Sequence, residues 1–161
     1  MQGLKIYATS IAPEWIDYNG HLRDAYYGLV ASYACDSLMH HLGMDEIYRQ
    51  TTQCTLYSLE QHLHFFHEVK QSDHLTVAAR ILAADHKRIH AVFGLYSERY
   101  QDPAASTEQM LLHVKQGDTP SAVSFPPEIS ANIAAMIALT AATDPKECTT
   151  TPGSRRMELR R

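Results

Sequence analysis

The spacing of apolar residues changes once along this chain, and that change constrains the fold more than any other feature. Between Ala25 and Leu42 the apolar side chains recur every three to four residues, which is typical of a helix packed on one side. The positions that form this stripe are Tyr26, Val30, Tyr33, Ala34, Leu38 and Leu42. Residues 44–50 are expected to add a helical turn. Beyond them the spacing falls to two, which indicates β-strands.

Four such strand segments follow one another along the chain. The positions that share a face are Tyr57, Leu59, Gln61, Leu63 and Phe65; Leu75, Val77, Ala79, Ile81 and Ala83; Ile89, Ala91, Phe93 and Leu95; and Glu108, Met110, Leu112 and Val114. Short polar links at 68–73, 84–87 and 100–105 join the segments. Parallel strands need long crossover connections, so these links predict an antiparallel meander.

A strand at 4–10 and a helix opened by Pro126 and Pro127 complete the pattern. The sequence therefore predicts an α+β fold, in which a curved antiparallel sheet wraps around one long central helix and a C-terminal helix follows. A single sheet on a single helix leaves much surface to cover, so we expect a homodimer or homotetramer.

Composition limits the class of protein. The 161 residues predict one domain over residues 1–142, followed by a flexible polar tail at 143–161. A formal charge of -4 argues against a nucleic-acid-binding protein, and no apolar run is long enough to span a membrane. Three widely spaced cysteines and the absence of an apolar leader predict a cytoplasmic protein with reduced thiols.

The stretch WIDYNGHLRDAYY, from Trp15 to Tyr27, joins a polar loop to the start of the long helix. Gly20 permits a tight turn and Asn19 can fasten it. The N–H groups at the helix start can polarise a carbonyl, while Asp17 attacks its carbon or activates water and His21 orients the water or the loop. The alternative is that Asp17 and Asp24 only cap the turn and the helix.

The same stretch resembles a known family. Its D-x-x-G-H pattern is similar to the signature of hotdog-fold acyl-CoA thioesterases of the 4-hydroxybenzoyl-CoA thioesterase type. WIDYNGHLRDAYY, DHKRIHAVFGLY and TEQMLLHV more closely resemble the thioesterases of bacterial carnitine breakdown, which hydrolyse betainyl-CoA and occur alone or fused to carnitine dehydrogenase. The similarity covers roughly residues 4–140.

The resemblance implies roles for two aspartates. Asp17 matches the catalytic carboxylate, and Asp24 matches the helix-start residue whose backbone N–H polarises the thioester carbonyl. Many members of the family have two Asn residues after G-H-V, whereas this chain has Leu22, Arg23 and Asp24. Hydrogen bonds made by those Asn side chains therefore do not carry over. The implied reaction is hydrolysis of an acyl-CoA thioester without a cofactor or a metal.

A betainyl group would bring a permanent cation into the site. Aromatic faces attract such cations, which makes Trp15, Tyr26 and Tyr27 candidate substrate contacts beside Asn19 in the loop. The alternative for these rings is ordinary core packing. Two carboxylates, Asp36 and Glu60, are candidates to offset the positive charge, unless they are simply solvated.

Lys87 and Arg88 form a basic turn that is a candidate for binding the CoA phosphates, with plain surface charge as the alternative. Three other functions remain open on the sequence. They are a thioesterase for another short or aromatic acyl group, a non-catalytic acyl-CoA-binding module, and a hotdog hydratase. The last needs a D-x-N-P-x-H-like arrangement, which DYNGH does not match.

Overall fold

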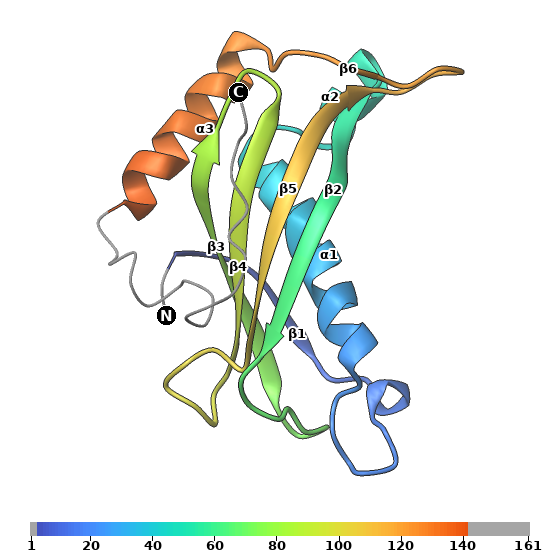
Figure 1. The fold of residues 1–161 in the computed structure, drawn as a ribbon, viewed down its shortest axis with the longest axis vertical. Coiled ribbons are helices and arrows are strands. Elements are labelled where there is room, and N and C mark those ends of the chain that lie inside the picture. Colours follow the sequence, from blue (N-terminus) through green and yellow to red (C-terminus); the bar gives the residue numbers. More distant parts are fainter. Residues whose placement is uncertain (1–2, 142–161) are drawn as a thin grey trace.

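The computed structural model describes residues 3–141, which form one curved sheet and three α-helices (Figure 1). The elements are β1 (Leu4–Ser10), a 3₁₀ turn η1 (Pro13–Trp15), α1 (Asp24–His41), α2 (Glu46–Thr52), β2 (Cys54–Phe65), β3 (His74–Ala84), β4 (Arg88–Ser97), β5 (Ala105–Lys115), β6 (Ser121–Ala122) and α3 (Pro127–Thr140). The expected tail at 143–161 lies outside the described residues. No helix in the described part of the chain is long and apolar enough to cross a membrane.

All strand pairs of the sheet are antiparallel, and the strands follow the order β1-β3-β4-β5-β2, with the short β6 beside β5. The predicted meander is correct for β3, β4 and β5 but wrong for β2. That strand pairs with β5, and β1 takes the place beside β3. The link 66–73 is consequently no hairpin, because it carries the chain from one edge strand across to β3 on the far side of the sheet.

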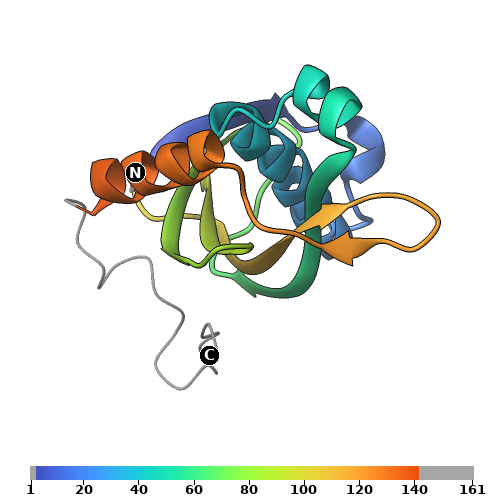
Figure 2. The same ribbon diagram turned by 90° about the horizontal axis from the view of Figure 1, so that it is seen from above.

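Helix α1 lies in the hollow of the sheet (Figure 2). Its buried face includes Val30, Ala31 and Ala34, each with no exposed surface, and the two small side chains let strands approach the helix closely. The helix ends as predicted, with Gly43 in a left-handed conformation at φ 86°. Tyr33 departs from the predicted stripe, because it is 42% exposed and rests against Tyr7.

Strand β2 carries a bulge that changes which side chains face the core. Ser58 pairs with Leu111 and Glu60 with Met110, so Leu59 is an extra residue without an opposite partner. The single face predicted from Tyr57 to Phe65 is therefore interrupted. Tyr57 and Leu59 are 38% and 55% exposed on an edge of the sheet.

A buried histidine joins three elements at the end of the sheet near α2. The ring of His113 accepts a hydrogen bond from the Tyr48 hydroxyl at Nε2 (2.9 Å) and donates from Nδ1 to the Val123 carbonyl (3.0 Å). Phe125 stacks on the same ring, with 4.8 Å between centroids. These contacts tie α2 and the segment before α3 to β5, and burial of the ring favours the neutral imidazole.

We predict that this histidine makes the fold sensitive to mild acid. Burial lowers the pKa of His113, so the unfolded chain takes up a proton before the folded chain does. The free energy of unfolding should therefore fall as the pH drops below about 6.5, towards the lower folded-state pKa. In urea unfolding followed by circular dichroism, His113→Gln should show a smaller loss of stability across this range than the native chain. An equal loss in both proteins would contradict the prediction.

Candidate active site

Asp17 is held by its own loop. Its Oδ1 accepts hydrogen bonds from the backbone N–H groups of Asn19 (2.8 Å) and His21 (3.0 Å). The bond from His21 is the main reason why the pKa of the Asp17 carboxyl lies below its usual value, so the group is ionised at neutral pH. Gly20, at φ 81°, permits the turn that aims these N–H groups inward. A hydrogen bond from the Asn19 side chain lowers the pKa of the carboxyl further.

The loop is fastened to the start of α1. The Arg23 N–H donates to the Trp15 carbonyl (3.0 Å), and the Asp17 N–H donates to the His21 carbonyl (2.8 Å). No side chain caps the helix at Arg23, while Asp24 lies in the first turn. The first N–H groups of a helix have no acceptor within it and carry the positive end of its dipole. The Ala25 N–H already donates to Asp24 Oδ1 (2.8 Å) and the Tyr26 N–H to the Arg23 carbonyl (3.0 Å). The Asp24 N–H is therefore the group at which a carbonyl oxygen can be polarised.

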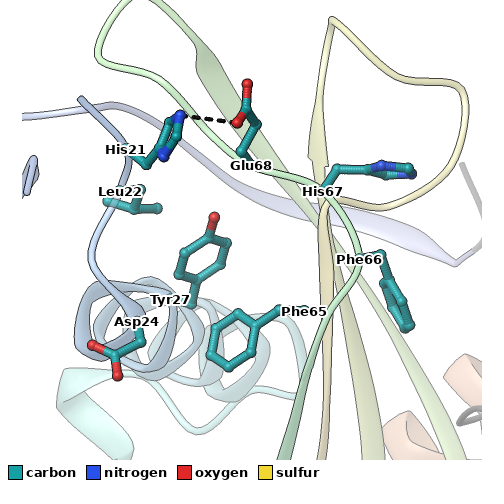
Figure 3. A pocket seen from close by; sticks show the side chains of 8 residues that line it. All are labelled: His21, Leu22, Asp24, Tyr27, Phe65, Phe66, His67 and Glu68. Atoms are coloured by element: carbon teal, nitrogen blue, oxygen red, sulfur yellow. Dashed lines mark ion pairs between the residues drawn. The ribbon is translucent and has the colours of Figure 1, made fainter. Parts of the chain in front are cut away.

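A pocket of about 270 Å³ opens at this helix start (Figure 3). It is lined by His21, Leu22, Asp24, Tyr27, Phe65, Phe66, His67 and Glu68. His21 Nε2 lies 2.8 Å from Glu68 Oε2, which orients the ring from the far side of the pocket. The Leu22 N–H donates to the Val69 carbonyl at 2.7 Å, so the same segment that carries Glu68 is also joined to the loop.

Tyr27 forms the inner wall of the pocket. It is 4% exposed, and burial raises its pKa to about 12, so the phenol stays neutral. Phe65 meets it edge-on, with ring centroids 5.1 Å apart. A buried neutral phenol beside a half-exposed phenyl ring gives this wall an aromatic surface.

The structure gathers one group of the predicted site residues. Asp17, Asn19 and His21 share the loop, and Asp24 and Tyr27 follow in the first turn of α1. Only His21, Asp24 and Tyr27 of these line the pocket. Asp17 reaches the pocket through His21, whose backbone it holds.

The predicted aromatic pair Trp15 and Tyr26 lies outside this pocket lining. Their rings stack on each other with 5.4 Å between centroids and 16° between planes. Both are half-buried against the core. The stack braces the loop against the helix.

The two carboxylates expected to offset a cation lie elsewhere in the chain. Asp36 follows Asp24 by twelve residues on α1, or about 18 Å along a helix. It lines a separate cavity of about 180 Å³ together with Cys35 and Gln109. Glu60 lies in the middle of β2, where its Oε1 is 2.9 Å from His62 Nε2.

Lys87 lies on the turn between β3 and β4 and Arg88 begins β4, at the end of the sheet opposite the α1 start (Figure 1). The Arg88 guanidinium is paired with the Asp85 carboxylate. Asp85 Oδ2 lies 2.7 Å from Arg88 Nη2 and 2.8 Å from Arg88 Nε. Within residues 3–141, no group of three or more His, Cys, Asp and Glu side chains is arranged to hold a metal ion.

The segment from Phe65 to Glu68 lines the pocket, although the sequence did not predict it as part of the site. Its position depends on the pairing of β2 with β5, which carries the following link past the helix start. Locally, the sequence shows only two adjacent aromatic residues and an acidic residue at the end of a strand. Such a pattern does not predict where in the fold the segment lies.

Comparison with known proteins agrees with this geometry. A model of the thioesterase-like superfamily matches residues 11–133, which is most of the chain. The chain belongs to this superfamily. The predicted hotdog fold and the resemblance to thioesterases are thus confirmed.

Three thioesterase-like relatives show how far the similarity extends. The betainyl-CoA thioesterase of Pseudomonas aeruginosa is 45% identical over 135 residues, which cover 84% of each chain. The L-carnitine dehydrogenase/betainyl-CoA thioesterase of Agrobacterium fabrum is 34% identical over 78% of this chain and 25% of its own length. A crystal structure of an inferred thioesterase from Pseudomonas putida, 30% identical, matches with a TM-score of 0.80 over 100% of this chain and 99% of the other.

We predict that the stack of Trp15 on Tyr26 stabilises the fold. Tyr26→Leu removes the ring contact and should lower the free energy of unfolding by about 1 kcal/mol in urea denaturation. The matched control is Tyr18→Leu, because Tyr18 is 93% exposed in the same loop and should change stability little. Equal stability of Tyr26→Leu and the native chain would show that the stack contributes nothing.

Proposed function

We propose that this chain hydrolyses betainyl-CoA to glycine betaine and free CoA in the cytoplasm, as a step of carnitine breakdown. The observation that carries the proposal is the 45% identity to a betainyl-CoA thioesterase, spread over 84% of both chains. The superfamily match supports the reaction type, and the site at the α1 start supplies groups that suit it.

In the proposed reaction the thioester carbonyl oxygen lies against the Asp24 N–H at the α1 start. This N–H and the positive end of the helix dipole stabilise the negative charge that develops on the oxygen. Asp17 either attacks the carbonyl carbon, giving an anhydride that water then cleaves, or takes a proton from a water that attacks directly. In both routes one water is consumed, the C–S bond breaks, and CoA leaves as a thiolate that takes up a proton.

His21 has a defined task in this scheme. Its backbone N–H holds the Asp17 carboxylate and its ring is oriented by Glu68. With Nε2 directed at Glu68, Nδ1 is the nitrogen that can contact water or the substrate. His21 thus positions Asp17 and the attacking water.

We predict that Asp17→Asn abolishes most of the activity without disturbing the fold. The amide oxygen of Asn can still accept the hydrogen bonds from Asn19 and His21, but it is neither a nucleophile nor a base. Thiol release from betainyl-CoA should fall by about 100-fold or more. Near-normal turnover by a folded Asp17→Asn protein would exclude a catalytic carboxylate here, and no release by the native chain would exclude betainyl-CoA as the substrate.

We further propose that the protein is a homodimer or homotetramer that assembles through the free edge of β2. Within residues 3–141 this strand ends the sheet order and pairs with β5 alone, and it exposes Tyr57 and Leu59. An edge strand with exposed apolar side chains favours pairing with another copy of the chain.

We predict a mass of at least two chains by light scattering at micromolar concentration. Leu59→Lys should lower that mass by placing charge on the edge, whereas Ile47→Lys should not, because Ile47 is an equally apolar residue that is 70% exposed on α2. A monomeric native chain would refute the assembly, and an effect of Ile47→Lys equal to that of Leu59→Lys would refute the β2 edge.

A further inference from the structure

The pocket at the α1 start combines aromatic rings with carboxylates. Tyr27 and Phe65 meet nearly at right angles, with 85° between their planes, and both line the pocket. Phe65 is 51% exposed in spite of its apolar ring, and Figure 3 shows it directed towards Tyr27 while Phe66 points the other way. Aromatic faces are the surfaces to which quaternary ammonium groups bind.

Two carboxylates line the same pocket, those of Asp24 and Glu68. Glu68 Oε2 faces His21 at 2.8 Å, while its Oε1 lies 3.3 Å from Lys70 and 4.0 Å from Arg99. The positive end of the α1 dipole attracts the carbonyl oxygen but repels a cation attached close to it. A substrate with both groups needs negative charge beside the helix start. Glu68 supplies such charge, which it shares with Lys70 and Arg99. The Asp24 carboxyl points away from Tyr27 and Phe65 in Figure 3, and its Oδ1 accepts from the Ala25 N–H at 2.8 Å.

The chemistry of the proposed substrate restricts where its cation can lie. In a betainyl thioester one methylene separates the nitrogen from the carbonyl carbon, which puts the two atoms about 2.5 Å apart by standard bond lengths. A carbonyl at the α1 start therefore keeps the trimethylammonium group in the same pocket. Asp36, about 18 Å further along α1, is too far away within one chain to contact it.

We propose that Tyr27, Phe65 and Glu68 hold the trimethylammonium group of the substrate and give the enzyme its preference for a cationic acyl group. This inference rests on the proposed function. The candidate contacts for the cation are therefore Tyr27 and Phe65, which line the pocket. Trp15 and Tyr26 were expected in this role, but their rings stack on each other.

The test compares betainyl-CoA with 3,3-dimethylbutyryl-CoA, which has nearly the same shape without the charge. The readout is the ratio of the two kcat/KM values from thiol release. Phe65→Leu should lower this ratio by about 2- to 30-fold, the range expected from losing one contact between a cation and a ring. Glu68→Gln should lower it as well. The rate with the neutral substrate should change much less than the rate with betainyl-CoA in Phe65→Leu.

Two matched variants serve as controls. Phe65→Tyr keeps an aromatic face and should keep the ratio. Glu98→Gln removes an exposed carboxylate that does not line the pocket and should also keep it. Circular dichroism of each variant checks that the fold is intact.

The outcomes separate the two proposals. If the native chain releases no thiol from betainyl-CoA, the proposed function is wrong and the cation site is wrong with it. If the native chain prefers betainyl-CoA and Phe65→Leu and Glu68→Gln keep that preference, the proposed function stands and the cation site is refuted. If Glu98→Gln lowers the ratio of the two kcat/KM values as much as Glu68→Gln does, the cation site is also refuted. General surface charge would then explain the preference.

Discussion

The hydrogen bond between the Leu22 N–H and the Val69 carbonyl, at 2.7 Å, joins the two segments on which the site depends. One is the loop that carries Asp17 into α1, and the other is the link between β2 and β3. The loop follows β1, and the link runs from the edge strand β2 to β3, the neighbour of β1. Without this junction the loop would present a carboxylate and a helix end, but no opposite wall would face them.

Helix α1 serves both the core and the chemistry. Its middle is fixed in the hollow of the sheet by fully buried residues such as Val30 and Ala34. The axis of the helix, and with it the direction of its dipole, is therefore set by packing far from the reacting atoms. The helix start, where we propose that the oxyanion forms, is therefore held in place by the same packing that forms the core.

The sequence predicted the bounds of the helices and strands better than it predicted which strands pair with one another. The spacing of apolar residues placed the long helix within one residue at each end, since α1 runs from Asp24 to His41. It failed at Leu59, where a bulge adds one residue to β2 and breaks the alternation. It also misjudged the partner of β2, because strand pairing is a contact between distant parts of the chain.

The same distinction applies to the site. Asp17, His21, Asp24 and Tyr27 are close in sequence, and a turn followed by a helix brings them together without help from the rest of the fold. Phe65 and Glu68 join them only through the order of the strands, which no local pattern encodes. Charge alone made Asp36 and Glu60 candidates, and neither of them lines the pocket at the α1 start.

His21 contacts two different acidic residues. Its backbone N–H donates to the Asp17 carboxylate, and its ring pairs with the Glu68 carboxylate. A change at either acid is therefore transmitted through one residue to the other. Substitutions at Asp17 and Glu68 should consequently be non-additive, with the second costing less once the first is made. In evolutionary terms the two positions are epistatic, so a relative that varies at one of them is expected to have rebuilt the other side of the pocket as well.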